Sequence, residues 1–179
     1  MKGRGEIVAL DVYKRRLDSL RARARRDDCQ NIRVRVVEAD APAEPDLLGR
    51  MEYVLIDAPC TGIGVLRRNP DVRWKTSVPE IEELAARQRA LLDRYAPCVA
   101  PGGRLVYATC SILREENEAN VEDFLTRHGE FRAGDVRKPL SRYGLERLAP
   151  DGGPCLRLWP HRHGADGFFI AVLERTGEK

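Results

Sequence analysis

The stretch that most constrains the fold runs from Tyr53 to Gly62 and reads Tyr-Val-Leu-Ile-Asp-Ala-Pro-Cys-Thr-Gly. Its leading apolar residues are typical of a short strand that is buried on both faces of a parallel sheet. Because Pro59 cannot donate a hydrogen bond to a sheet, the strand is predicted to end near Asp57. A carboxylate and the thiol of Cys60 are therefore expected at the carboxyl end of a strand, where open α/β sheets bind ligands.

A second predicted strand, from Arg104 to Thr109, is also followed by a cysteine, Cys110. Both thiols precede turns or helix starts, where the pKa of a thiol can fall below its usual value of about 8.5. A thiolate in such a place can form a transient covalent bond with an electrophilic carbon, and a second thiol can transfer protons. The remaining cysteines are interpreted as inert core residues: Cys29, Cys98 and Cys155.

Strands and helices alternate along the rest of the chain. Strands are predicted at residues 6–11, 32–38, 51–57, 104–109 and 167–173, with shorter extended segments at 131–136 and 156–159. Helices are predicted from Tyr13 to Ala24, from the N-cap Ser77 to Tyr95, and from Glu115 to His128. This alternation predicts an α/β fold with a mostly parallel, doubly wound sheet in a single domain spanning residues 1–179. The connection from residue 60 to residue 79 is long, as functional loops often are.

Two further acids come at strand ends, Asp11 after the first strand and Asp40 after the second. In nucleotide-binding folds such an acid accepts hydrogen bonds from ribose hydroxyls, although it can equally cap the next helix. Two of them in succession favour a cofactor that contains a nucleoside. Neither glycine-x-glycine stretch, at residues 3–5 and 62–64, has the third glycine or the position of a phosphate-binding loop.

Composition narrows the class of protein. The chain is 42% hydrophobic and 33% charged, which is typical of a globular domain. Its net charge is +3, but basic residues gather at 14–26 and 67–75, which suits either a nucleic-acid partner or solvated surfaces. The five cysteines include no CxxC pair, which argues against zinc and for a reduced, cytoplasmic protein. No stretch approaches the ~18 apolar residues of a membrane helix, so no membrane partner is expected.

The stretches Asp57–Gly62 and Tyr107–Ser111 resemble the cysteine motifs of the Sun-type (Fmu) RNA cytosine carbon-5 methyltransferases, which modify ribosomal RNA. Further similar stretches lie at residues 67–74, 115–118 and 163–169. The likeness covers nearly the whole chain, from about Gly5 to Leu173. It implies a Rossmann-like methyltransferase fold, S-adenosyl-L-methionine as cofactor and RNA, ribosomal RNA above all, as partner.

The resemblance also implies roles for single residues. The thiolate of Cys110 would add to carbon 6 of a cytosine splayed from its stack, which makes carbon 5 nucleophilic toward a methyl group. The thiol of Cys60 would assist the elimination that releases the product, and Asp57 would contact the target base. Asp11 and Asp40, with Asp57, would be the acids of the cofactor site. Candidate phosphate contacts are Arg67, Arg68, Arg73 and Lys75.

The relatives differ from this chain upstream of Gly3, where the family has a further strand, a glycine-rich cofactor loop and often an RNA-binding domain. The family's strand order is 3-2-1-4-5-7-6, so strand 1 is expected to be missing between the strands of Asp11 and Asp57. Such a gap leaves two unpaired edges, which predicts direct pairing of the flanking strands or an unstable or oligomeric fragment.

These features predict a truncated catalytic domain of an RNA cytosine methyltransferase. The main alternative is a catalytically incompetent fragment or an RNA-binding remnant of such an enzyme. A DNA cytosine methyltransferase also uses a Pro-Cys thiol, but the Thr-Cys-Ser strand end and the Phe168–Phe169 pair favour RNA.

Overall fold

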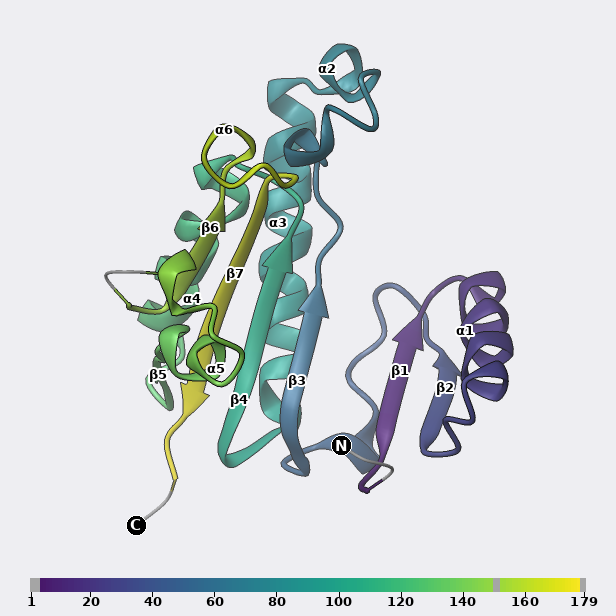
Figure 1. Cartoon of the computed structure of the whole chain (residues 1–179). Coiled ribbons are helices and arrows are strands. Elements are labelled where there is room, and N and C mark those ends of the chain that lie inside the picture. The colour runs from purple at the N-terminus through teal and green to yellow at the C-terminus, as the bar shows by residue number, and fades with distance from the viewer. Residues whose placement is uncertain (1–3, 150–151, 178–179) are drawn as a thin grey trace. The chain divides into compact units, whose positions relative to one another are not determined.

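A computed structural model describes residues 4–149 and 152–177 of the chain and places them in two compact units, Met1–Pro42 and Ala43–Lys179. The first unit contains β1 (Ile7–Asp11), α1 (Lys14–Arg26) and β2 (Ile32–Val36), and its two strands pair in parallel (Figure 1). Leu17 is the buried residue of α1. The helix was predicted to start at Tyr13, which is instead its N-cap, with 59% of its surface exposed.

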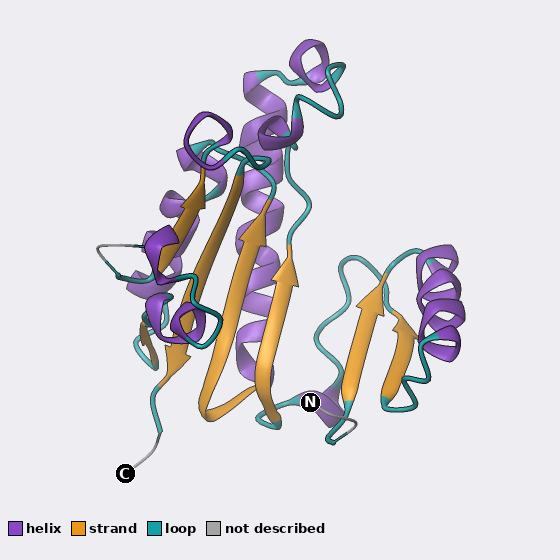
Figure 2. Ribbon diagram, viewed as in Figure 1, coloured by secondary structure: helices purple, strands orange, loops and turns teal. Residues whose placement is uncertain are grey.

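The second unit holds a five-stranded sheet. Its strands are β3 (Met51–Asp57), β4 (Val99–Thr109), β5 (Phe131–Ala133), β6 (Cys155–Leu158) and β7 (Phe168–Arg175). The order is β3-β4-β7-β5, and β6 also pairs with β7. β3 and β4 are parallel, whereas β7 is antiparallel to each of its neighbours (Figure 2). The other strands of this sheet therefore all run opposite to β7, which confirms the α/β class.

Two long helices build the core of this unit with the sheet. They are α3 (Val78–Tyr95) and α4 (Glu118–Arg127). The Ser77 side chain accepts a hydrogen bond from the Glu80 amide, which confirms the predicted N-cap. Leu92 of α3 and Phe124 of α4 are fully buried against strand residues such as Tyr107. Short helical segments complete the unit: η1 (Pro45–Leu47), η2 (Ile63–Val65), α2 (Val72–Lys75), η3 (Ala96–Cys98), η4 (Arg114–Glu116), α5 (Arg137–Ser141), η5 (Glu146–Leu148) and α6 (Pro160–His163).

The prediction that β3 is buried on both faces is wrong. Ile56 is buried with Leu92, but Tyr53 and Leu55 on the opposite face are 67% and 69% exposed. The reason is position, because β3 is the last strand in the order of its sheet and α3 packs only against the face that carries Ile56. An apolar run reveals that a strand is β-prone but not how many neighbours it has.

The strands of Asp11 and Asp57 do not pair directly. Among the described strands, β1 pairs with β2 in one sheet and β3 pairs with β4 in another. Of the two predicted outcomes, pairing of the flanking strands is therefore not found among the described strands. An unstable or oligomeric fragment, and a single domain over the whole chain, stay predictions. No helix in the described part of the chain is long and apolar enough to cross a membrane.

Several element boundaries also differ from prediction. β2 ends at Val36, two residues before the predicted end at residue 38, and β4 starts at Val99, five residues before the predicted Arg104. The pairing of β3 with β4 shifts register between Met51 and Tyr53, which admits the glycine-rich start of β4 into the strand. The connection after Cys60, expected to lack regular structure, contains η2 and α2.

Candidate active site

The structure brings the two predicted thiols together. Cys60 Sγ lies 3.3 Å from Cys110 Sγ. Parallel pairing places Asp57 opposite Ala108, and the amide of Ala58 extends the ladder by donating to the Ala108 carbonyl at 2.9 Å. Because β3 and β4 end at the same edge of the sheet, the loops that follow them meet there, as the sequence predicts.

The contact between the two sulfurs shifts the pKa values of the two thiols in opposite directions. The pKa of Cys110 is lowered to about 7, chiefly because the Cys60 thiol donates a hydrogen bond to its thiolate, while burial acts in the opposite direction. The pKa of Cys60 is raised by this same hydrogen bond and, next, by burial. Of the two thiols, Cys110 is therefore the one that ionises, while Cys60 keeps its proton.

Buried polar side chains fix the residues on both sides of Cys60. The Gln88 amide donates to the Pro59 carbonyl at 2.8 Å and to the Glu116 carboxylate at 3.1 Å. Glu116 also accepts hydrogen bonds from the Thr61 amide at 2.8 Å and the Thr61 hydroxyl at 2.6 Å. Gln88 and Glu116 are fully buried, so the Cys60 loop is held from the protein interior.

The residues on both sides of Cys110 are fixed in a similar way by Asn117. Its side chain accepts a hydrogen bond from the Thr109 hydroxyl at 2.6 Å and donates to the Ser111 carbonyl at 3.0 Å. Asn120 extends the buried network from Gln88, because its amide donates to the Gln88 side chain at 2.8 Å and to the Glu116 carbonyl at 3.2 Å. We call this buried set the polar floor: Gln88, Glu116, Asn117 and Asn120.

Only part of the polar floor has a signal in the sequence. Gln88 lies between Ala85 and Leu92 on the buried side of α3, where a polar residue among apolar ones marks a buried hydrogen-bonding position. Glu116 has no such signal, because the adjacent Glu115 is exposed and of the same type. Its partners are distant in the sequence, with a separation of 55 residues to Thr61 and 28 to Gln88.

A close approach of two backbones fastens the loop after Cys60. The Gly64 amide donates to the Cys110 carbonyl at 3.0 Å, and the Gly167 amide donates to the Gly64 carbonyl at 2.8 Å. A Cβ atom on Gly64 would lie 2.3 Å from the Gly167 carbonyl oxygen and 2.7 Å from that of Cys110. Glycine is therefore required here by space, and not for binding phosphate.

The predicted acids have different environments. Asp57 is exposed at the end of β3, and its charge acts against ionisation of Cys110 by raising the thiol pKa. Asp11, in the first unit, accepts a hydrogen bond from the Tyr13 amide at 2.8 Å and pairs with Arg16 at 3.5 Å, so it also supports the start of α1. Asp40 lies in an exposed turn four residues after β2 ends.

These carboxylates suit the hydroxyl-bearing part of a nucleoside cofactor in their chemistry. Within the described ranges the side chains of Asp40 and Asp57 accept no hydrogen bond, and the second oxygen of Asp11 has only its 3.5 Å contact with Arg16. Exposed carboxylates of this kind are free to accept hydrogen bonds from ribose. Their assignment to a cofactor site stays a prediction.

The predicted phosphate contacts are only partly free. Arg68 forms an ion pair with Asp166, and Arg67 lies 3.7 Å from the same carboxylate, which is buried. Arg73 lies over the ring of Trp74 at 5.6 Å. The backbone of Lys75 belongs to α2, but its side chain lies outside the described part of the chain. Arg67 and Arg68 remain largely exposed, so both can still face a phosphate while Asp166 orients them.

The other cysteines lie apart from this site. Cys98 is buried, as expected of a core residue, but Cys29 is exposed and Cys155 belongs to β6 rather than to a loop. Burial raises the pKa of Cys155 to about 11, which keeps it protonated. Cys60 and Cys110 differ from these three in that each follows the carboxyl end of a strand.

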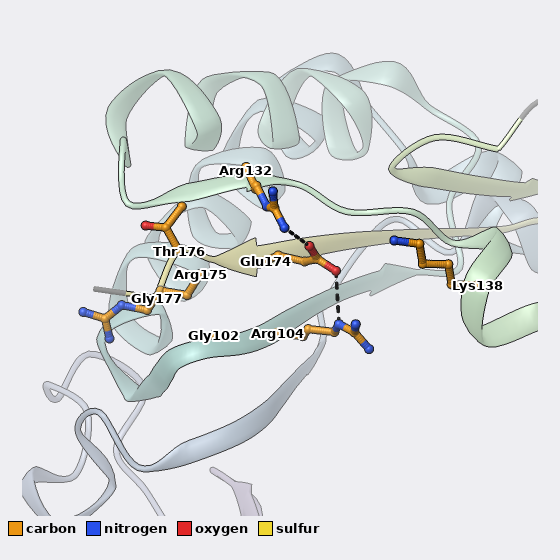
Figure 3. Close-up of a pocket in the computed structure, with 8 residues that line it drawn as sticks. All are labelled: Gly102, Arg104, Arg132, Lys138, Glu174, Arg175, Thr176 and Gly177. Atoms are coloured by element: carbon orange, nitrogen blue, oxygen red, sulfur yellow. Dashed lines mark hydrogen bonds and ion pairs between the residues drawn. The ribbon is translucent and has the colours of Figure 1, made fainter. Parts of the chain in front are cut away.

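A hollow of about 500 Å³ lies toward the opposite end of β4 and β7 (Figure 3). Glu174 stands between two of its cations and accepts hydrogen bonds from Arg104 at 3.3 Å and Arg132 at 3.0 Å. Arg175 donates to the Val99 carbonyl. Most of these charged side chains have partners within the protein. We therefore interpret them as a network that stabilises this end of the sheet, rather than as a binding site.

The chain is similar to known proteins of one family. Residues 1–174 match the family model described as 16S rRNA methyltransferase RsmB/F. A probable ribosomal RNA small subunit methyltransferase B of Synechocystis sp. is 36% identical over 176 residues, which are 98% of this chain and 39% of that protein. The corresponding probable enzyme of Bacillus subtilis is 33% identical over 180 residues, again 39% of its length.

Solved structures give the same result. The structure titled "Crystal Structure of PH0851" superposes with a TM-score of 0.85 at 39% identity and covers 98% of this chain and 38% of that one. NSun6 from Pyrococcus horikoshii, solved with SFG, superposes with a TM-score of 0.74 at 27% identity over 99% of this chain and 43% of its own. The chain thus spans about two fifths of the length of these relatives, and the methyltransferase-like fold is confirmed over that part.

Proposed function

This chain belongs to the 16S rRNA methyltransferase RsmB/F family, and from that premise we propose that it carries the thiols for methylation of cytosine carbon 5 in ribosomal RNA. The observation that supports this most is the 3.3 Å contact between Cys60 Sγ and Cys110 Sγ. It provides a nucleophile and a proton-transfer group side by side at a strand-end site. The function would place the protein in the cytoplasm with ribosomal RNA as its partner.

In this proposal Cys110 is the nucleophile. Its sulfur forms a bond to carbon 6 of cytosine, and the electron pair of the C5–C6 double bond moves so that carbon 5 becomes nucleophilic. S-adenosylmethionine, when bound, supplies the methyl group that carbon 5 takes. Product release then requires loss of the proton from carbon 5 and cleavage of the C6–S bond, which returns Cys110 as a thiolate and restores the double bond.

Cys60 is the group that removes this proton. While Cys110 is an anion, Cys60 is held protonated by the hydrogen bond that it donates. Once Cys110 is bonded to carbon, its negative charge is gone and the main cause of the raised Cys60 pKa disappears. Cys60 can then release its proton to solvent and accept the one from carbon 5. Cys60 therefore acts first as a hydrogen-bond donor to the Cys110 thiolate and then, once Cys110 is bonded to carbon 6, as the base.

The exposed carboxylate of Asp57 is assigned to the target base. It lies three residues before Cys60, and its charge disfavours the Cys110 thiolate, so it does not serve to activate the nucleophile. A contact with the ring would instead favour the charge distribution that attack at carbon 6 needs. Asp11 and Asp40 are assigned to the ribose and adenine of the cofactor, and Arg67, Arg68, Arg73 and Lys75 to RNA phosphates.

The roles of the thiols are tested by trapping. With small-subunit ribosomal RNA and S-adenosylmethionine, the Cys60→Ala variant should accumulate a covalent protein–RNA adduct that survives a denaturing gel. Cys110→Ala should form none. An adduct on Cys110→Ala and not on Cys60→Ala would reverse the two roles, and no adduct on either variant would count against the mechanism in this chain.

A second candidate is an RNA-binding remnant that has the thiols but no competent cofactor site. It is supported by Arg67 and Arg68, which stay largely exposed beside the buried Asp166 and can face RNA phosphates. Calorimetric titration of the folded chain with S-adenosylmethionine separates the two functions. Binding heat would support the enzyme, whereas a folded chain that gives no heat would favour the remnant.

A further inference from the structure

We propose that Glu116 is a positioning residue, which holds the Cys60 loop at the distance where the Cys60 thiol can reach Cys110. The inference rests on the proposed roles of the two thiols and extends them to a group that does not itself touch either sulfur. The observations that support it are the hydrogen bonds of Glu116 with Thr61 and Gln88.

Three donors converge on the Glu116 carboxylate. The amide of Thr61 lies 2.8 Å from Oε1, the hydroxyl of Thr61 lies 2.6 Å from Oε2, and the Gln88 amide lies 3.1 Å from Oε1. Thr61 directly follows Cys60, so its amide and side chain are both fixed by the same carboxylate. This bidentate grip defines where the Cys60 backbone lies and which way it turns.

The other side of Cys60 is tied to the same acid through one intermediate. Gln88 shares its amide between Glu116 and the Pro59 carbonyl at 2.8 Å. Pro59 and Thr61 are therefore connected beneath Cys60 by two buried side chains. On the opposite side of the site, Asn117 fixes the two neighbours of Cys110. The sulfur–sulfur distance is thus set from both sides by the polar floor.

Burying a carboxylate is costly unless hydrogen bonds or opposite charges replace its contacts with water. Glu116 is fully buried and forms no ion pair with a lysine or arginine in the described part of the chain. Its compensation comes from the three donors above. Removing it would leave the Thr61 amide and one contact of Gln88 unsatisfied in the interior.

Electrostatics alone would argue against an acid at this place. Among charged groups of the neighbouring elements, Asp57 of β3 and Glu116 of η4 both raise the pKa of Cys110. The charge of Glu116 therefore opposes formation of the Cys110 thiolate. Its hydrogen bonds, in contrast, position the Cys60 thiol, which favours that thiolate. We conclude that geometry, rather than charge, is what Glu116 contributes.

The test measures the acidity of Cys110 in the chain itself, without RNA or cofactor. Alkylation by iodoacetamide is followed across pH, and the Cys110 peptide is quantified by mass spectrometry. The wild-type midpoint is expected at about 7. In Glu116→Ala it should move toward the ordinary value of about 8.5, which is about a 15-fold slower alkylation at neutral pH.

Three further variants separate positioning from charge and from general stability. Thr61→Val removes one hydrogen bond to Glu116 and should shift the midpoint in the same direction by less. Glu116→Gln keeps an acceptor for the Thr61 amide without the charge, so its midpoint should stay at or below the wild-type value. Glu115→Gln changes an exposed neighbouring acid and should leave the midpoint unchanged.

The inference is overturned if folded Glu116→Ala and Thr61→Val both titrate like the wild type, or if Glu116→Gln shifts upward as far as Glu116→Ala. If Glu116→Ala does not fold by circular dichroism, Thr61→Val and Glu116→Gln decide the matter. Because the assay uses neither RNA nor S-adenosylmethionine, it can succeed while the adduct experiment fails. Failure of the positioning role and failure of the proposed function are thereby distinguishable.

Discussion

The sulfur atoms of Cys60 and Cys110 lie 3.3 Å apart, and the hydrogen bond between them is the first cause of the low pKa of Cys110. Loss of the donor in Cys60→Ala should therefore raise the Cys110 pKa from about 7. The thiolate would then form only at higher pH, seen as an upward shift of its ultraviolet absorbance titration. Cys60→Ser keeps a hydroxyl donor and should retain most of the low value; an equal shift in both variants would contradict this cause.

Gly64→Ala should disturb the loop after Cys60. The new methyl carbon would lie 2.3 Å from the Gly167 carbonyl oxygen, and because backbone atoms cannot move aside freely, the hydrogen bonds of Gly64 must lengthen. Such overpacking is expected to lower the free energy of unfolding by about 1–3 kcal/mol. Urea denaturation measures this, with Gly129→Ala as control, since a Cβ there meets nothing within 4 Å. Equal stabilities of the two variants would refute the requirement for close approach.

The pair of Arg68 and Asp166 should be structural as well as available to RNA. Asp166 is buried, and neither of its oxygens accepts a well-formed hydrogen bond among the described residues, so the guanidinium is its main compensation. Arg68→Ala is expected to destabilise the fold by about 1–3 kcal/mol. Adding Asp166→Asn should recover part of that loss, because the unpaired charge disappears.

Thermal unfolding of the single and double variants checks this coupling. Arg73→Ala is the matched control, since the Arg73 guanidinium lies over the exposed Trp74 ring rather than beside a buried acid. If Asp166→Asn adds to the loss instead of relieving it, the ion pair is not the compensation for the buried acid.

The exposed side of β3 should promote self-association. Tyr53 and Leu55 present an apolar face on a strand at the end of its sheet, where unpaired backbone groups can join another chain. Leu55→Lys should reduce the concentration-dependent mass seen by sedimentation. Val78→Lys, which charges an equally exposed residue on α3, should change it little. A wild-type chain that stays monomeric at all concentrations would rule this surface out.

The sequence predicts those parts of the fold that depend on neighbouring residues. The Ser77 cap, the limits of β3 and the meeting of Cys60 with Cys110 follow from local pattern and from the rule that parallel strands end at one edge. The exposure of Leu55 does not follow, because it depends on which strand lies beside β3. The same local pattern also leaves Asp11 ambiguous, since its contact with Tyr13 is compatible with both proposed roles.

Glu116 is the clearest case of a residue that local pattern cannot identify. Glu115 before it is of the same type and exposed, so residue type and spacing do not indicate that Glu116 is buried. Its function depends on Thr61 and Gln88, which reach it only when β3, α3 and η4 have packed together. Likewise, the ion pair of Arg68 with Asp166 joins two loops that the sequence treats separately.

The polar floor has a consequence for the order of folding. Its contacts with the Cys60 loop close loops of 55 residues to Thr61 and 29 residues to Pro59, and the two thiols are 50 residues apart. Contacts this far apart in sequence form late, because the entropy of loop closure must be overcome first. The reactive thiolate should therefore emerge only when the chain has reached its native topology, so that partly folded molecules carry ordinary, unreactive cysteines.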